Sequence, residues 1–320
     1  MRLPKVRDPR SLLNNGLSML RIENQPLIRE MLAECIGTFF LVLIGNSANI
    51  QAAAATVENS TSQHIAWGIG FTFGCYLAAS VSGAHLNPAI SFSQFLLSNF
   101  PLWKLPIYIF VQVVGAFLGA GVAYFGHYDD LKKLDGGSRS VTGYGHTAEL
   151  FVTFPKEHLS VWGAVVDQII GTAMLSGLIH LITDKRHNIP PPMIPPLAGS
   201  IVTMIAMTFG ANAGFAMNPA RDLGPRLLCL CVGYGVEVFT AHGHYFWIPL
   251  FIPFAGALIG ALFYKIFVGL HGSGDLMATT EAPPEYKSEE NRPVQTQISV
   301  ENTNWERSSA KRELDFVECV

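Results

Sequence analysis

The second half of the chain repeats the first, and this repeat constrains the fold more than any other feature. Asn-Pro-Ala occurs twice, at 87–89 and at 218–220, each time after a stretch that begins with glycine. Segments on either side also match in the same order, 33–38 with 167–172 and 115–120 with 256–261. The sequence therefore predicts two structurally equivalent halves.

Hydropathy indicates that both halves lie in a membrane. Hydrophobic residues make up 49% of the 320 residues and charged residues 14%. A bilayer core needs about 20 apolar residues per helix. Two apolar segments, 87–97 and 218–230, are too short to span and start at Asn-Pro-Ala, which is typical of re-entrant half-helices. Segments of spanning length lie at 29–51, 63–82, 104–125, 160–183, 194–213 and 245–268.

The count of helices in each half determines its orientation. Three is odd, so the second copy enters the membrane from the opposite side and the broken helices meet near the midplane. We expect an all-α membrane protein with six transmembrane helices plus two re-entrant half-helices in an inverted 3+3 repeat. The predicted parts are a cytoplasmic N-terminus (1–26), a first repeat (27–126), an extracellular loop (127–158), a second repeat (159–268) and a disordered cytoplasmic tail (269–320).

Basic residues predict the topology. The first 26 residues are basic and Lys185 and Arg186 occupy a short connection, whereas 52–62 has no Lys or Arg. Because cytoplasmic loops are enriched in Lys and Arg, both termini are expected in the cytoplasm of a multi-pass protein of the plasma membrane. Asn59 begins an Asn-Ser-Thr sequon on the opposite side and is a candidate glycosylation site.

Other classes of function fit poorly. A net charge of -3 favours neither nucleic acid nor an acidic substrate. Cys229 and Cys231 lack the neighbouring histidines of a zinc site, and no His-Glu-x-x-His pattern occurs. We expect no metal, no cofactor and no enzyme activity. An even helix count opposes a seven-helix receptor.

The two signature stretches, 82–89 and 214–226, resemble those of the aquaporin superfamily, and specifically its glycerol-conducting branch, the aquaglyceroporins of animal type. The resemblance covers roughly 27–268. It implies a passive channel that conducts glycerol, water and other small neutral solutes such as urea while excluding protons and ions. It also implies a homotetramer in the lipid bilayer with a separate pore in each subunit. The alternative is a water-selective aquaporin.

The resemblance also identifies residues that distinguish the branch. Trp67, Phe215 and Arg221 fall at the selectivity constriction, with Ala206 where water-selective relatives have histidine. The aromatic pair would contact the carbon backbone of a polyol while Arg221 donates to its hydroxyls. Further markers of the glycerol branch are Asp222, Arg226, Pro249 and Leu250.

The Asn-Pro-Ala turns predict how ions are excluded. Asparagine is a good N-cap and proline suits the first helical position, so Asn87 and Asn218 each start a half-helix. Each half-helix N-terminus carries roughly half a positive charge and repels cations, while each amide donates to a passing oxygen. The turns comprise Pro88, Ala89, Pro219 and Ala220, and backbone carbonyls of Gly83, Ala84, His85, Ala213 and Gly214 are expected to line the pore.

Three smaller predictions complete the interpretation. Glu34 and its counterpart Gln168 are expected to support the half-helices from within the helix bundle. His85, close to the first half-helix, is a candidate pH sensor because histidine titrates near neutrality. Pro283, Pro284 and Tyr286 in the tail fit a ligand of a WW-domain protein.

Overall fold

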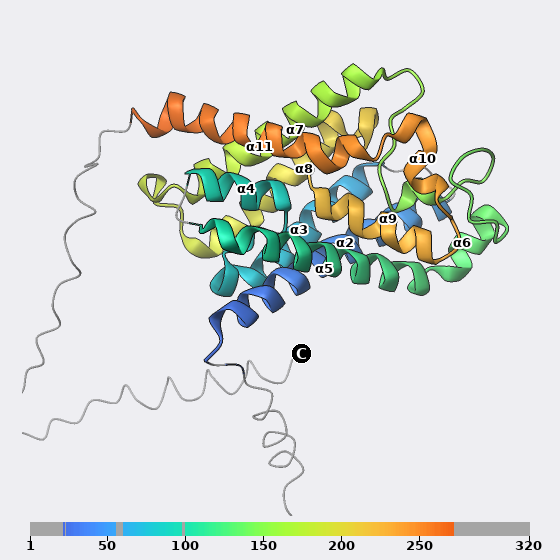
Figure 1. The fold of residues 1–320 in the computed structure, drawn as a ribbon, viewed down its shortest axis with the longest axis horizontal. Coiled ribbons are helices and arrows are strands. Elements are labelled where there is room, and N and C mark those ends of the chain that lie inside the picture. Colours follow the sequence, from blue (N-terminus) through green and yellow to red (C-terminus); the bar gives the residue numbers. More distant parts are fainter. Residues whose placement is uncertain (1–21, 23, 56–59, 98–99, 272–320) are drawn as a thin grey trace, which may run out of the picture. The chain divides into compact units, whose positions relative to one another are not determined.

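The computed structural model describes residues 22, 24–55, 60–97 and 100–271, and within these ranges the chain is helical without strands. They belong to one compact unit, Met1–Ser273, and the second unit, Gly274–Val320, lies outside them. The long helices are α2 (Pro26–Ala54), α3 (Ser60–Ser82), α5 (Leu105–Gly126), α7 (Val161–Thr183), α8 (Ile194–Ala213) and α11 (Trp247–Tyr264) (Figure 1). Shorter helices are α4 (Pro88–Leu97), α6 (Tyr128–Asp135), α9 (Pro219–Cys231) and α10 (Glu237–His244), with single turns at Leu102–Lys104, Ala148–Leu150, Lys185–His187, Pro191–Met193 and Lys265–Gly269.

Five helices of the described part are long and apolar enough to cross a membrane. They are α3, α5 extended to Leu102, α7, α8 extended to Pro191, and α11 extended to Gly269. The sixth long helix, α2, has 29 residues and carries Arg29, Glu30 and Glu34. It nevertheless takes the place in the first half that α7 takes in the second.

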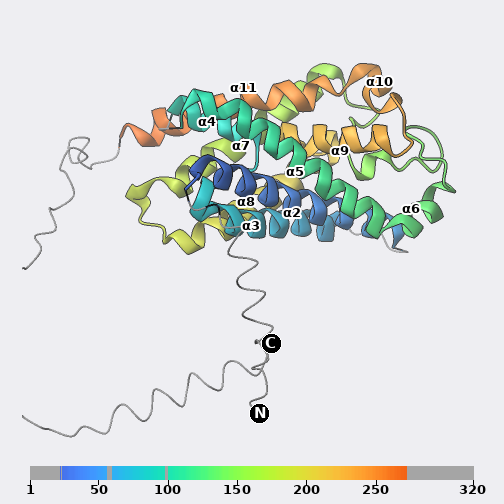
Figure 2. The ribbon, with the colours of Figure 1, turned by 60° about the horizontal axis from the view of Figure 1, so that its bottom comes forward.

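The packing of the helices has the predicted internal symmetry. In the first half α2 packs against α3 and α5, and in the second half α7 packs against α8 and α11. The halves meet where α3 crosses α8. Each half-helix also packs against the last helix of the other half, α4 on α11 and α9 on α5, and α4 and α9 point inward from opposite ends of the bundle (Figures 1 and 2).

Glycines allow the paired helices to approach closely. A Cβ atom at Gly115 or Gly119 of α5 would overlap backbone carbonyls of α2, and one at Gly256 would lie 2.7 Å from the carbonyl oxygen of Ile169 in α7. Gly260 contacts the carbonyl of Ala173 still more closely. Since lipid provides no hydrophobic drive between helices, such contacts between backbones hold the bundle together.

Where α3 crosses α8, glycines allow the same close approach, and they do so at equivalent positions of the two halves. A Cβ atom at Gly68 would meet Thr203 Oγ1 and one at Gly199 would meet Thr72 Oγ1. The two halves are thus in contact through equivalent glycine and threonine pairs.

The connection between α5 and α7, which covers the loop predicted over 127–158, is partly helical. It contains α6 and buries Phe151 and Val152 in the main core. Asp135 accepts two hydrogen bonds from Arg139 at 2.7 and 2.8 Å and a third from Thr147 at 3.0 Å. Burial raises the pKa of the Asp135 carboxyl, but hydrogen bonds from Arg139, Gly137 and Thr147 outweigh it and hold the pKa below its usual value.

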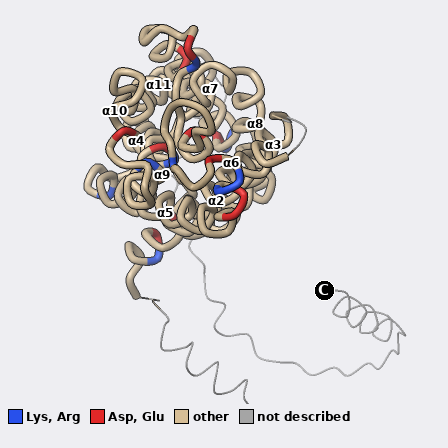
Figure 3. The backbone as a smooth tube through the Cα atoms, turned by 90° about the vertical axis from the view of Figure 1, so that its right-hand side faces the viewer, with Lys and Arg blue, Asp and Glu red and all other residues tan. Residues whose placement is uncertain are grey.

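Charged residues are sparse along the backbone. Most of the tube in Figure 3 is tan. Two buried charged residues, Asp222 and Arg226, form an ion pair on α9 one helical turn apart. Charges inside an apolar bundle are expensive unless paired, so this pair has a structural or functional reason.

Candidate functional site

The half-helices begin as their sequences predict. The Asn218 Oδ1 atom accepts from the backbone N–H groups of Ala220 at 3.0 Å and Arg221 at 3.2 Å. Asn87 Oδ1 accepts from the Ala89 N–H at 2.9 Å. Proline opens both helices, because a residue at the first helical position needs no N–H partner.

The two turns are joined directly to each other. Asn87 Nδ2 donates to the Met217 carbonyl at 2.9 Å, and Asn218 Nδ2 donates to the Leu86 carbonyl at 2.7 Å. An amide nitrogen carries two hydrogens, so each asparagine keeps one donor beyond this cross-link. Residues 130 and 132 positions apart in sequence therefore fix the mutual position of the half-helix ends.

The segments before the turns have a strained backbone in both halves. In the first half Ala84 and Leu86 have φ of 53° and 51°, and in the second Phe215 and Met217 have φ of 39° and 47°. Residues other than glycine rarely adopt such φ values, and each residue that does so costs about 1 to 3 kcal/mol of conformational strain. This non-helical backbone persists because buried side chains hold it.

Glu34 of α2 holds the first segment. Its Oε1 accepts from Ser82 Oγ at 2.6 Å and His85 N at 2.9 Å. Its Oε2 accepts from Leu86 N and Gln112 Nε2, both at 2.8 Å. One fully buried carboxylate thus binds two successive backbone donors of the segment.

Gln168 of α7 holds the second segment differently. Its Oε1 accepts from Met217 N at 3.1 Å, and its Nε2 donates to the adjacent Asp167 Oδ2 at 3.2 Å. The other oxygen of Asp167 accepts from Asn212 Nδ2 at 3.0 Å. Asp167 therefore supplies a buried carboxylate next to the amide, a contribution that sequence reasoning missed.

Trp67, Phe215 and Arg221 lie together. The Trp67 and Phe215 rings meet edge to face with centroids 6.0 Å apart. The guanidinium carbon of Arg221 lies 4.3 Å from the Trp67 ring centroid, close enough for a cation–π contact. Arg221 is buried and its Nη1 donates to the Phe151 carbonyl at 3.3 Å, while its Nε has no hydrogen-bond partner among the described residues.

Ala206, the fourth expected member of the constriction, is fully buried in α8 and lines none of the cavities described below. Gly210, one turn later, borders a cavity of about 200 Å³ together with His64; it is called the outer cavity from here on. A Cβ atom at Gly210 would lie 3.0 Å from Phe215 Cδ1 and 3.2 Å from His64 Nε2. Gly210 and His64 belong to no motif, so neither could be identified from the sequence.

Asp222 and Arg226 connect α9 to the segment between α5 and α7 and to α10. Asp222 Oδ2 accepts from Thr153 N at 2.9 Å and from Thr153 Oγ1 at 2.6 Å. Arg226 donates to the Thr153 carbonyl at 2.6 Å and to the Val238 carbonyl at 2.5 Å. Of the other two markers, Pro249 is buried and Leu250 is half-buried in α11, and neither borders a cavity described below.

Three cavities follow one another between the two ends of the bundle. The outer cavity, about 200 Å³, adjoins a central cavity of about 30 Å³, since Phe215 and Arg221 border both. Asn87 and Asn218 border the central cavity, which has room for about one water molecule. Phe71 borders both the central cavity and an inner cavity of about 490 Å³.

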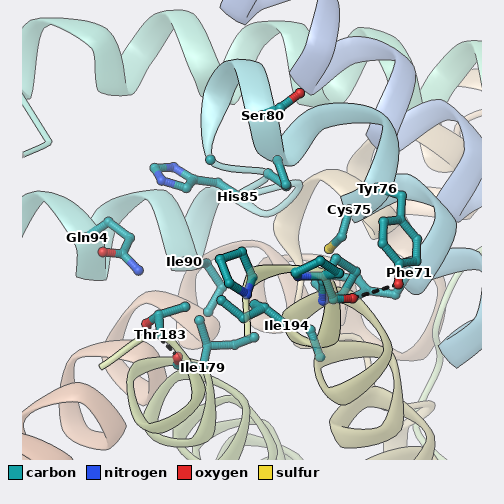
Figure 4. Close-up of a pocket in the computed structure, with 17 residues that line it drawn as sticks. Phe71, Cys75, Tyr76, Ser80, His85, Ile90, Gln94, Ile179, Thr183 and Ile194 are labelled. Carbon is teal, nitrogen blue, oxygen red and sulfur yellow. Dashed lines mark hydrogen bonds between the residues drawn. The ribbon is translucent and has the colours of Figure 1, made fainter. Parts of the chain in front are cut away.

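The inner cavity is lined by Gly83, Ala84 and His85 of the first segment and by Ile179 and Ile194 of the second half (Figure 4). His85 Nδ1 lies 3.1 Å from Ser91 Oγ, and its ring contacts Phe100 and Tyr108 with centroids 4.8 and 5.3 Å away. Ala213 and Gly214 lie in the other half, where Gly214 borders the outer cavity and Ala213 is buried.

Some predicted sites lie outside the described residues. These are Asn59 and the tail residues Pro283, Pro284 and Tyr286.

Comparison with known proteins gives consistent similarities. The family model described as Major intrinsic protein matches residues 21–264. Aquaporin-10 of Homo sapiens is 38% identical over 248 residues, which are 77% of this chain and 82% of that protein. Aquaporin-9 of Mus musculus is 36% identical over 281 residues, 86% of this chain and 92% of that protein.

A solved structure agrees with these similarities. The X-ray structure of the aquaglyceroporin from Plasmodium falciparum has a TM-score of 0.70 and 32% identity to this chain, covering 76% of it and 98% of that chain. The predicted inverted repeat with two half-helices is thereby confirmed.

Proposed function

The chain belongs to the major intrinsic protein family, and on that premise we propose that its three cavities form a pore that passively conducts glycerol and water. It is a channel and not an enzyme. One observation carries the solute assignment: an apolar corner of Trp67 and Phe215 faces a buried arginine whose Nε has no partner among the described residues. A solute with CH groups on one edge and hydroxyls on the other suits such a wall.

The path begins in the outer cavity and narrows at Arg221. A polyol lays its carbon edge on the two rings and accepts a hydrogen bond from Arg221, then passes Asn87 and Asn218 in the central cavity. The free amide hydrogens of both asparagines donate to its oxygens. The N-termini of α4 and α9 meet there, and their partial positive charges oppose cations and interrupt proton transfer along water.

Stopped-flow light scattering of proteoliposomes tests the proposal. Glycerol and water should both cross faster than in empty vesicles, and urea should follow glycerol, while sucrose and protons should not cross. Fast water with glycerol no faster than in empty vesicles would favour the alternative, a water-selective aquaporin. Slow transport of both would reject the channel.

Orientation and location extend the proposal. Both termini are assigned to the cytoplasmic side of the plasma membrane. The start of α2 and the end of α11 lie at the same end of the bundle, which supports a common side (Figures 1 and 2). Asn59 would then face outward and carry a glycan. Treatment of cell-expressed protein with an N-glycosidase should shift its electrophoretic mobility, and Asn59→Gln should abolish the shift.

A homotetramer is proposed from the family resemblance. All three cavities lie within one chain, which agrees with a separate pore in each subunit. Large apolar side chains such as Phe110, Phe125 and Phe251 are exposed on the helices and suit contact with lipid or another subunit. Native mass spectrometry in mild detergent should give four times the chain mass.

Two regulatory roles complete the proposal. His85 borders the inner cavity, so its protonation would alter that mouth of the pore. Glycerol flux should change between about pH 5 and 7.5, and a flat profile at constant protein amount would reject the role. Pro283, Pro284 and Tyr286 are assigned to a WW-domain partner, and a tail peptide that binds no WW domain would reject that role.

A further inference from the structure

Asn49 of α2 connects the constriction to the turn Ala148–Leu150 between α5 and α7. Its Oδ1 accepts from Trp67 Nε1 at 3.1 Å, and its Nδ2 donates to the Leu150 carbonyl at 3.0 Å. Asn49 is half-buried and borders the outer cavity, as Phe215 and Arg221 do. It is therefore in contact both with the constriction and with the solute path that leads to it.

Packing alone does not determine how the Trp67 indole is oriented within the plane of its ring. One face of the ring lies on Gly45, where a Cβ atom would overlap ring carbons. Arg221 lies over the ring 4.3 Å from its centroid, and Phe215 meets it edge to face. These contacts set the plane of the ring, whereas a hydrogen bond from its edge defines which way the N–H points within that plane.

We propose that Asn49 is a specificity-determining positioning residue, which takes up the indole N–H so that Trp67 presents only carbon to the solute. This rests on the proposed conduction of glycerol. Arg221 then provides the hydrogen-bond donor at the constriction, beside the two aromatic rings. The separation of polar and apolar sides suits a polyol, whose own polar and apolar edges match it.

The direction of the effect follows from the unpaired donor. Without Asn49 the indole N–H lies buried with no acceptor, a state that costs more than the hydrogen bond contributed. Water from the outer cavity can satisfy the donor, as bridging waters commonly do at polar sites. A water held at the ring edge occupies the surface that the carbon edge of glycerol needs, so glycerol permeability falls more than water permeability.

The chain provides a matched control in Asn46, one turn earlier on α2. Asn46 Nδ2 donates to the same Leu150 carbonyl at 3.0 Å, but its side chain makes no hydrogen bond to Trp67. Asn46→Ala and Asn49→Ala therefore each remove one bond to Leu150. They differ in the bond to the indole.

The experiment measures glycerol and water permeability in the same proteoliposomes, so that their ratio does not depend on the amount of folded protein. Asn49→Ala should lower the glycerol-to-water ratio by about 3- to 10-fold, the factor expected for one hydrogen bond. Asn46→Ala should leave the ratio unchanged. If Asn49→Ala fails to fold, Asn49→Leu, which keeps the branching at Cγ and the number of side-chain heavy atoms but has no acceptor, serves in its place.

A double-mutant cycle tests whether Asn49 acts through the indole. Trp67→Phe removes the N–H, so adding Asn49→Ala to it should lower the ratio no further. The inference is overturned by a wild-type ratio in Asn49→Ala, by an equal loss in Asn46→Ala, or by a full additional loss in the Trp67→Phe background. Wild-type vesicles that pass glycerol no faster than empty ones would instead overturn the proposed function, and the inference with it.

Discussion

Replacing Glu34 with glutamine should destabilise the protein, although the two side chains have the same shape. The carboxylate accepts four hydrogen bonds, two on each oxygen, from Ser82, His85, Leu86 and Gln112. Glutamine has one oxygen, so two donors lose their acceptor and face an N–H group instead. The Ser82 hydroxyl can turn away, but a backbone N–H cannot.

The magnitude follows from these bonds. One buried backbone donor left unpaired costs about 1 to 3 kcal/mol. The remaining bonds change from charge-assisted to neutral and lose roughly half their strength. We expect a total of about 2 to 4 kcal/mol, or an apparent melting temperature lower by about 5 to 15 °C.

The assay is thermal unfolding in detergent, followed by size-exclusion chromatography of the surviving protein. Glu30→Gln on the same helix is the control, because Glu30 is partly exposed and accepts only from the side chains of Lys104 and Tyr108, which can turn to the remaining oxygen, so a loss of no more than about 1 kcal/mol is expected. If Glu34→Gln melts with the wild type, the four hydrogen bonds to Glu34 do not contribute as this reasoning requires, and the reasoning is wrong.

Three further predictions follow. Gln168→Glu should destabilise the fold by placing a second carboxylate beside Asp167 Oδ2, now 3.2 Å from the amide, and adding Asp167→Asn should restore stability in the same melting assay. Gly260→Val should lower stability by about 2 to 3 kcal/mol because α11 contacts the α7 backbone there, and a wild-type melting curve would contradict this. The pKa of Asp135 is lowered, so its stabilisation is complete above the usual carboxyl pKa of about 3.9 and is lost as pH falls through the lower folded value. The melting difference between wild type and Asp135→Asn should therefore shrink only below about pH 4, and a difference that disappears between neutral pH and pH 5 would refute the role of Asp135.

Local chemistry made much of the fold predictable. The starts of the half-helices at Asn87 and Asn218 were predictable because helix capping involves only residues within three positions of the cap, and the structure places both starts as predicted. The long helices were predictable because the length of an apolar segment is also a local property of the sequence. Helices α6 and α10 were missed, because each has only 8 residues, which is too short for a periodic apolar pattern to be read from the sequence.

The candidate site was predictable only where a motif marked it. The family resemblance identified Trp67, Phe215 and Arg221 as neighbours, and the structure brings them together. Asn49 lies in an apolar helix without a motif, and its role depends on a partner 18 residues away on another helix. Gly210 borders the outer cavity where Ala206 does not, since one turn of α8 separates a pore-facing position from a buried one.

The sequence by itself determined the two-fold repeat, the helices of spanning length and the capped half-helix starts, since each depends on residues close together in the chain. Only the tertiary structure decided how the halves join and what holds the pore wall. The cross-links between Asn87 and Met217 and between Asn218 and Leu86 connect distant segments. The four hydrogen bonds to Glu34 and the hydrogen bond from Trp67 to Asn49 also depend on tertiary structure. A hydrogen bond between distant segments exists only after the helices have brought donor and acceptor together.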